Sequence, residues 1–328
     1  MARVTVFTLG GTISARGGDA SRMSGREVLA ELGGGHDVVL RDFRRVPSSS
    51  LTHEDLAALA AEVRDTVADG SGAVVVQGTD TLEETAFLLD LLCTTEQPVV
   101  VTGAMRRPDL PGADGPANLA AALAVAADPA CRNLGVLVVL ADEIHAARFA
   151  RKTHTTSVAT FASPGAGPLG FVVEGGPRLL LRPAVPSTPH RLTLDPAVRV
   201  ALVTLSQGDR GELLEAVDGR FQGLVVAALG AGHVPGWLVD PLAALATRIP
   251  VVLASRTGGG TTLTDTYRGP GSEYDLLHRG LIPAGPLDPA KARVLLHALL
   301  SGGAAGPTGY DRPRITAAFA HLNGSGLA

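Results

Sequence analysis

Residues 73–92, which read AVVVQGTDTLEETAFLLDLL, contain the pattern that decides the fold. The segment opens with Ala73–Val76, an apolar and mostly β-branched run that is typical of a buried strand in a parallel sheet. A loop of glycine, hydroxyl and acidic residues follows, and Leu82–Leu92 then has the apolar spacing of a helix. A strand, a loop and a helix in this order predict one unit of a doubly wound α/β sheet.

The same alternation recurs on both sides of this segment. Other buried strands are expected at Val4–Phe7, Val99–Val101, Val136–Leu140, Val198–Leu205, Leu224–Leu229 and Val251–Ala254. A further helix is expected at Leu56–Val67, and the aromatic content of 4% predicts an aliphatic core. We therefore predict two doubly wound α/β domains, a larger N-terminal one and a smaller C-terminal one, each with a mainly parallel sheet.

A proline-rich stretch interrupts this rhythm. Pro183, Pro186 and Pro189 fall within seven residues, which favours an extended linker at about 182–197. We place an N-terminal catalytic domain at residues 1–190 and a C-terminal domain at residues 198–328.

Composition narrows the class of protein. The 328 residues are 45% hydrophobic and 18% charged with a net charge of −4, which favours a globular chain and disfavours nucleic acid or an anionic membrane as a partner. We find no uninterrupted apolar stretch of about 18 residues, the length of a membrane span. Only two cysteines are present, and Met1-Ala2-Arg3 leads straight into the first strand without a signal-peptide pattern. The expected location is the cytoplasm.

Polar loops follow three of the expected strands. They are Gly10–Ile13, Gln77–Thr85 and Thr102–Arg106, and each combines glycine with hydroxyl, acidic or basic residues. Ligands of open α/β sheets bind beyond the carboxyl ends of the strands, and free backbone N–H groups there suit a carboxylate or an oxyanion. Part of the second loop also fits a helix start: Thr81 with Glu84 matches a capping box, and Glu83 with Glu84 is expected to be a pair of solvated or helix-start charges.

Several common motifs are absent from the sequence. It contains no phosphate-binding Gly-x-x-x-x-Gly-Lys, no Gly-x-Ser-x-Gly and no His-Glu-x-x-His. Gly230-Ala231-Gly232 lacks the third glycine of a dinucleotide-binding loop, and the histidines are scattered. These absences disfavour a dinucleotide cofactor and a metal site built on histidines.

The use of lysine is unusual. Of 28 basic residues only Lys152 and Lys291 are lysines, which leaves 26 arginines. An amine that can lose its proton is the property that arginine lacks, so we interpret Lys152, in a polar segment after a strand, as a proton-transfer residue near Asp80. Lys291 lies at an amphipathic helix start and is interpreted as structural.

These features together resemble the bacterial-type L-asparaginases, including the glutaminase-asparaginases. The resemblance spans almost the whole chain. It rests on Gly10–Ile13, the nine-residue motif Gln77–Thr85, Gly103–Arg106, Ala113–Pro116 with Asn118, Lys152-Thr153 with Val158–Phe161, and Ala290–Leu296.

The resemblance implies specific roles. Thr12 is the implied nucleophile that forms an acyl-enzyme, and Thr79, Asp80 and Lys152 complete the catalytic set. The implied substrate-binding residues are Gly11, Ser48, Ser49, Thr79, Asp80 and Ala104. The family works as a homotetramer of intimate dimers on L-asparagine, in some members also on L-glutamine, with no metal or cofactor.

The sequence departs from the family at three places. From Ser14 to Leu32 it lacks the tyrosine that helps to activate the nucleophile. Our hypothesis is that Tyr267 or Tyr274 reaches a neighbouring subunit's site, or that the loop closes without a tyrosine. Ser49 replaces a frequent glutamine, and a partner-subunit asparagine is replaced near Ala231-Gly232-His233.

Four functions stay open at this point. Asparagine hydrolysis is favoured, and dual use of asparagine and glutamine is its closest alternative. An asparaginase-like subunit of a tRNA-dependent amidotransferase would need an additional N-terminal module. A non-catalytic amino-acid-binding protein would not need all four of the implied catalytic residues.

Overall fold

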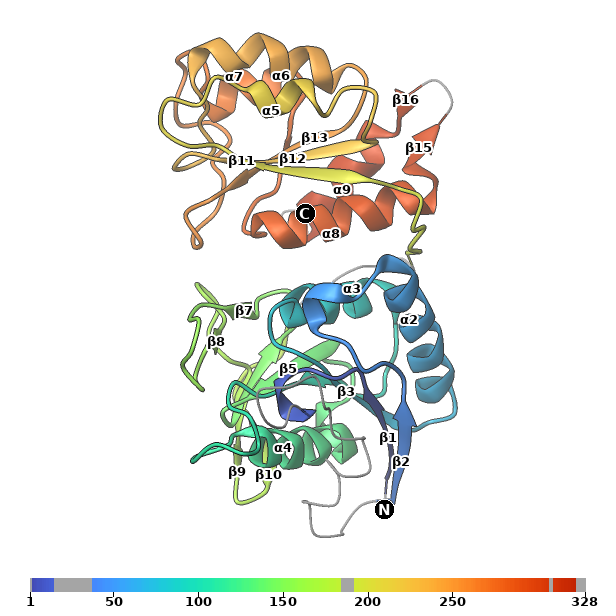
Figure 1. Cartoon of the computed structure of the whole chain (residues 1–328). Coiled ribbons are helices and arrows are strands. Elements are labelled where there is room, and N and C mark those ends of the chain that lie inside the picture. The colour runs from blue at the N-terminus through green and yellow to red at the C-terminus, as the bar shows by residue number, and fades with distance from the viewer. Residues whose placement is uncertain (1, 15–36, 184–191, 307–308, 323–328) are drawn as a thin grey trace. The chain divides into compact units, whose positions relative to one another are not determined.

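The computed structural model describes residues 2–14, 37–183, 192–306 and 309–322 (Figure 1). The chain separates into two compact units, Met1–Pro189 and His190–Ala328. Each unit has its own mainly parallel sheet and its own helices, which confirms the predicted fold class.

Among the described residues of the first unit, eight strands form one sheet in the order β10-β9-β6-β5-β4-β3-β1-β2. Strands β1 to β5 are parallel, whereas β6, β9 and β10 are antiparallel. The strands are β1 (Arg3–Thr8), β2 (Asp37–Asp42), β3 (Gly72–Val76), β4 (Val99–Thr102), β5 (Val136–Leu140), β6 (Glu143–Ala146), β9 (Gly170–Val173) and β10 (Gly176–Leu179).

Helices cover both faces of this sheet. Val74 and Val76 of β3 share a core cluster with Leu119 of α4 (Gly115–Ala127). Because side chains alternate along a strand, Val75 points to the opposite face, where α2 (His53–Ala68) and α3 (Leu82–Leu92) contact β3 and β4. Short helical turns lie at η1 (Thr12–Ser14), η2 (Ser48–Ser50) and η3 (Pro129–Cys131), and a small hairpin pairs β7 (Arg151–Lys152) with β8 (Phe161–Ala162).

The start of α3 differs from the expectation. Thr81 is the N-cap residue, but its side chain makes no capping hydrogen bond, so the expected capping box with Glu84 is wrong. The Thr81 hydroxyl instead donates to the carbonyl of Ser48 at 3.1 Å. A contact with a distant loop has replaced the local cap.

The second unit is smaller. Its parallel sheet has the order β11-β12-β13-β14, and Leu242 of α6 packs with Val226 and Leu253 on one face, while α8 contacts β11 and β12. The elements are β11 (Val200–Thr204), α5 (Glu212–Glu215), β12 (Gly223–Ala228), η4 (Gly236–Leu238), α6 (Val239–Ala246), β13 (Val251–Ser255), α7 (Glu273–His278), β14 (Ile282–Pro283), α8 (Pro289–Leu299), η5 (Leu300–Ala304), β15 (Ala305–Gly306), β16 (Gly309–Tyr310) and α9 (Arg312–Leu322).

The strand order creates a switch point between β1 and β3. From β1 the chain passes to β2 on one side, and the following strands β3, β4 and β5 are added on the other side. The loops that leave β1 and β3 therefore diverge, which opens a crevice beyond their carboxyl ends. The Gly10–Ile13 and Gln77–Thr81 loops lie at this point, since Leu9 N–H donates to the Val76 carbonyl at 2.9 Å.

Glycines allow the loops at the switch point to touch. Gly11 has φ +94°, and a Cβ there would lie 2.2 Å from the backbone nitrogen of Gly78. A Cβ on Gly78 would in turn lie 2.9 Å from the Oγ of Ser48. Backbone thus packs against backbone where a side chain would hold the loops apart.

The close packing at Gly11 predicts that a single added methyl group, in Gly11→Ala, strongly lowers the free energy of unfolding. Gly70 is a matched control because its φ is +91°, but no atom lies within 4 Å of an added Cβ. We expect Gly70→Ala to destabilise the first unit by about 1–2 kcal/mol through backbone strain alone. Gly11→Ala should cost a further ~1–3 kcal/mol because the loops must separate. Urea denaturation measures both, and equal losses would contradict the close approach.

A second prediction concerns His297, which is buried in α8 and whose Nε2 lies 2.9 Å from the Asp195 carbonyl. Burial lowers the pKa of His297 below its ordinary 6.5, although the Asp195 carbonyl opposes this shift. The unfolded chain therefore takes up the proton first as the pH falls, so this contribution to stability is lost below about pH 6.5. His297→Gln keeps an amide donor near Nε2 and does not titrate. Between pH 7 and 5, its melting temperature should fall less steeply than that of the wild type, and parallel curves would refute the assignment.

Candidate active site

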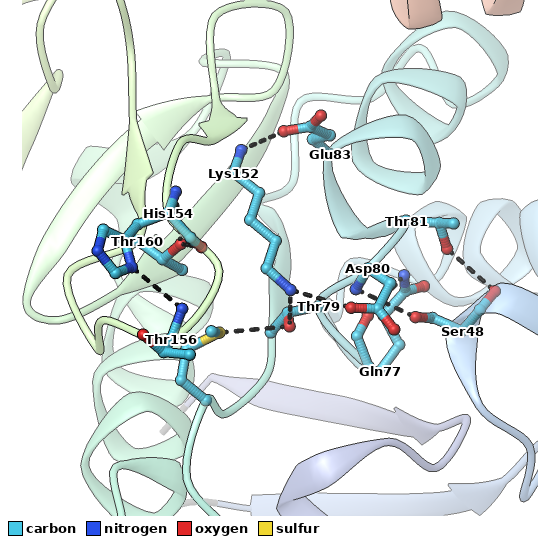
Figure 2. Close-up of polar contacts among 12 residues, drawn as sticks. Ser48, Gln77, Thr79, Asp80, Thr81, Glu83, Lys152, His154, Thr156 and Thr160 are labelled. Carbon is cyan, nitrogen blue, oxygen red and sulfur yellow. Dashed lines mark hydrogen bonds and ion pairs between the residues drawn. The ribbon is translucent and has the colours of Figure 1, made fainter.

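Lys152 joins two polar side chains of the β3 loop (Figure 2). It lies in β7, opposite Phe161 of β8. Its Nζ donates to the Oγ1 of Thr79 at 2.9 Å and to the Oδ1 of Asp80 at 3.0 Å. An amine, a hydroxyl and a carboxylate thus form one hydrogen-bonded group at the switch point.

The three side chains of this hydrogen-bonded group differ strongly in solvent exposure. Thr79 is buried, the Lys152 side chain is 19% exposed, and the Asp80 side chain is 67% exposed. The Thr79 hydroxyl also donates to the Sδ of Met105 at 3.3 Å, and a thioether is a weak acceptor. The amine and hydroxyl are shielded from water, which strengthens their electrostatic interactions, whereas the carboxylate can meet a charged ligand.

The backbone of Lys152 has its own anchor. Glu83, in the first turn of α3, accepts a hydrogen bond from the Lys152 N–H. The sequence-based interpretation of Glu83 as a solvated or helix-start charge is therefore incomplete. Its partner lies 69 residues away, and no local pattern points to it.

Ser48 ties the η2 turn to the β3 loop. It is buried, and its Oγ accepts a hydrogen bond from the backbone N–H of Asp80 at 3.2 Å. A hydroxyl that accepts in this way can still donate its own proton to an anion. Ser49, beside it, is exposed.

Asp114 and Asn118 fix the shape of the loop after β4. The carboxylate of Asp114 accepts hydrogen bonds from the N–H groups of Met105, at 2.9 Å, and Arg106, at 2.8 Å. Asn118 donates to the Gly103 carbonyl at 3.0 Å and to Asp114 at 3.1 Å. These bonds fix the backbone on both sides of the buried residue Ala104.

Thr12 begins η1, directly after the two glycines of the β1 loop, and is half-buried. Ile13 beside it is buried, and a Cβ on Gly115 would lie 2.8 Å from its Cγ1, so that α4 closes over this turn. Most of the tyrosine-free stretch from Ser14 to Leu32 falls in residues 15–36, outside the described residues.

Tyr267 and Tyr274 belong to the second unit. Tyr267 is 52% exposed and lies edge-on to the ring of His233, with 4.8 Å between centroids. The Nε2 of His233 lies 3.0 Å from a carboxylate oxygen of the buried Glu273. Burial raises the pKa of Glu273, but hydrogen bonds from the N–H groups of Tyr267 and Thr266 and from His233 outweigh burial and hold that pKa below its ordinary value. The guanidinium of Arg268 stacks on Tyr274 at 3.8 Å.

The part of the chain that the structure describes lacks two kinds of feature. Residues 2–14, 37–183, 192–306 and 309–322 contain no group of three or more His, Cys, Asp or Glu side chains arranged to hold a metal ion. Within the same ranges, no helix combines the length and the apolar character needed to cross a bilayer.

Two family models match the chain. The model described as "Asparaginase, N-terminal" matches residues 3–184, and the model described as "Glutaminase/Asparaginase C-terminal domain" matches residues 199–308.

Similar curated proteins cover most of the chain. L-asparaginase 2 of Escherichia coli (strain K12) is 35% identical over 316 residues, which cover 91% of this chain and 88% of that protein. A probable L-asparaginase of Deinococcus radiodurans is 37% identical over 308 residues, or 92% and 94% of the two chains. A Haemophilus influenzae protein named probable L-asparaginase periplasmic is 33% identical, with 91% and 88% covered. The chain therefore belongs to the asparaginase family.

Proposed function

We propose that the chain hydrolyses L-asparagine to L-aspartate and ammonia, with Thr12 as the nucleophile. One observation carries this proposal: the Lys152 amine contacts the Thr79 hydroxyl and the Asp80 carboxylate at the switch point. Family membership supports the reaction class, and the names of the relatives support the substrate.

In the first half-reaction, the Oγ1 of Thr12 attacks the carbon of the side-chain amide. The C–O bond forms, the hydroxyl proton leaves Thr12, and negative charge develops on the amide oxygen. Backbone N–H groups of the glycine-rich loops are suited to stabilise this oxyanion. The C–N bond then breaks, the nitrogen takes up the proton that Thr12 released and leaves as ammonia, and an aspartyl ester remains on Thr12.

In the second half-reaction, water attacks the ester carbon. The network of Thr79, Lys152 and Asp80 accepts the proton of the water and returns one to the oxygen of Thr12 as the ester bond breaks. Lys152 suits this role because an amine can both give and take a proton. Aspartate is released, and the enzyme returns to its starting state.

A carboxylate and a hydroxyl bind the two charged groups of the substrate. The exposed carboxylate of Asp80 binds the α-ammonium group, and the hydroxyl of Ser48 donates to the α-carboxylate with Ser49 beside it. Backbone groups of Gly11 and Ala104 contribute further contacts. This assignment is supported by the exposure of Asp80 and by the bond that positions the Ser48 hydroxyl.

The group that activates Thr12 has two candidate origins. Tyr267 or Tyr274 of a neighbouring copy supplies a phenol, or the loop closes without a tyrosine. The first origin agrees with the proposed assembly, a homotetramer of intimate dimers. The proposed location is the cytoplasm, supported by Cys93 and Cys131, which are both buried and are not joined in a disulfide.

Dual use of asparagine and glutamine is the second candidate. The family model that matches the C-terminal domain is described as "Glutaminase/Asparaginase", and this description favours dual use as an alternative. Glutamine is longer by one methylene group, and such a difference in a binding pocket changes kcat/KM by about 10–200-fold.

Ammonia release decides between these functions. The purified chain is incubated with asparagine or glutamine, and ammonia is followed over time. We expect release from asparagine, while comparable release from glutamine would identify a dual enzyme. No release from either amide would refute the proposal.

Two threonine variants test the assigned roles in the same assay. Thr12→Ala and Thr79→Ala should each lower kcat by at least about 100-fold. Thr12→Ala should also accumulate no acyl-enzyme after acid quench. Thr94→Ala, at an exposed position, is a matched surface control, expected to keep wild-type activity. Wild-type turnover by Thr12→Ala would exclude it as the nucleophile.

A further inference from the structure

His145 is a fully buried polar residue that the proposed mechanism does not use. It lies in β6, an interior strand that pairs with β5 on one side and with β9 on the other. Burying a group that can carry charge is costly unless the group is hydrogen-bonded. The contacts of its ring therefore indicate why a histidine occupies this position.

Each ring nitrogen of His145 faces a polar group. Nδ1 lies 2.9 Å from the Oγ of Ser163, and Nε2 lies 3.0 Å from the Oε2 of Glu143. Glu143 precedes His145 by two residues, so both side chains project from the same face of β6. The contact between Nδ1 and the Ser163 hydroxyl is a hydrogen bond whichever of the two atoms donates, and the Glu143 carboxylate lies beside the other nitrogen.

Ser163 lies at the base of the hairpin that carries Lys152. It directly follows β8, in which Phe161 pairs with Lys152 and Ala162 pairs with Arg151. A hairpin with strands of two residues each is marginal on its own, so its orientation depends on its anchors. The His145–Ser163 bond joins one leg of this hairpin to the main sheet.

We propose that His145 is a positioning residue, which fixes the β7–β8 hairpin through Ser163 and so holds the Lys152 amine against Thr79 and Asp80. This inference rests on the proposed function and names a further residue on which that function depends. Glu83 anchors the backbone of Lys152 from α3, while His145 anchors the opposite leg of the hairpin from β6. With both anchors in place, the long lysine side chain reaches Thr79 from a fixed starting point.

Replacements at residue 145 can separate this role from simple packing. The side-chain amide of asparagine reaches the place of Nδ1 and can keep the bond to Ser163. Glutamine reaches the place of Nε2 and loses that bond, although it is closer to histidine in volume. Ser163→Ala removes the same bond from the other side with little change in shape.

We expect His145→Gln and Ser163→Ala to lower kcat by about 10–100-fold, because a misplacement of about 1 Å at a catalytic group has effects of this size. KM should stay within about threefold of the wild type, since Ser48 and Asp80 are untouched. His145→Asn should stay within about threefold in both constants. His321→Asn, in α9 of the second unit, is the matched control.

A second readout does not depend on activity. The chain has two lysines, so peptide mapping by mass spectrometry can follow the acylation of each. Lys152 is partly exposed and reports the anchor, whereas the fully buried Lys291 becomes acylated only if the fold is lost. In His145→Gln and Ser163→Ala, the Lys152 amine should acylate several-fold faster than in the wild type. His145→Asn should acylate at the wild-type rate.

The outcomes separate the two claims. If the wild type releases no ammonia, the proposed function fails, while the acylation rates still test the anchor. Folded His145→Gln and Ser163→Ala proteins with wild-type kcat and wild-type acylation would overturn the positioning role. So would equal losses in His145→Asn and His145→Gln, since the bond to Ser163 would then not be the cause.

Discussion

The contact between the Lys152 amine and the Thr79 hydroxyl joins two segments that lie 73 residues apart in the chain. Bringing them together costs conformational entropy, and a single hydrogen bond at a partly exposed site contributes only about 1 kcal/mol. The surrounding structure must therefore hold both partners in place beforehand. The parallel sheet holds Thr79 at the end of β3, and Glu83 holds the backbone of Lys152. The fold of the first unit thus reduces the conformational entropy that is lost when the Lys152–Thr79 contact forms.

The chemistry of the site follows from where this contact lies. At the switch point, the glycines at residues 11 and 78 let two diverging loops touch. The shielded amine and hydroxyl form the side of the network suited to proton transfer, and the exposed Asp80 carboxylate forms the side suited to a charged substrate. Hydrolysis of an amide that bears an ammonium group uses both sides.

Much of the fold could be predicted, because its central strands are continuous apolar runs and the helices between them have regular spacing. The antiparallel strands β6, β9 and β10 were not predicted because each has only four residues, and β6 and β10 also contain polar residues such as His145 and Arg178. The capping box at Thr81 was wrong, because a tertiary contact with Ser48 replaced a local one. At the candidate site, glycine and hydroxyl patterns after strands pointed to the loops after β1 and β3, which the structure brings together at the switch point. The parts played by Glu83, Asp114 and His145 could not be predicted, because each depends on a partner that only the folded chain brings near. The catalytic roles of Thr12, Thr79, Asp80 and Lys152 stay predictions.

The central claim is that Lys152 acts as an amine that exchanges a proton, and not merely as a positive charge. Arginine keeps the charge and the ability to donate hydrogen bonds, but it does not lose its proton in proteins. The most direct test is therefore the kcat of Lys152→Arg for asparagine, in protein shown to be folded. We expect the kcat of Lys152→Arg to fall by at least about 100-fold, with KM nearly unchanged. A kcat within about threefold of the wild type would contradict it.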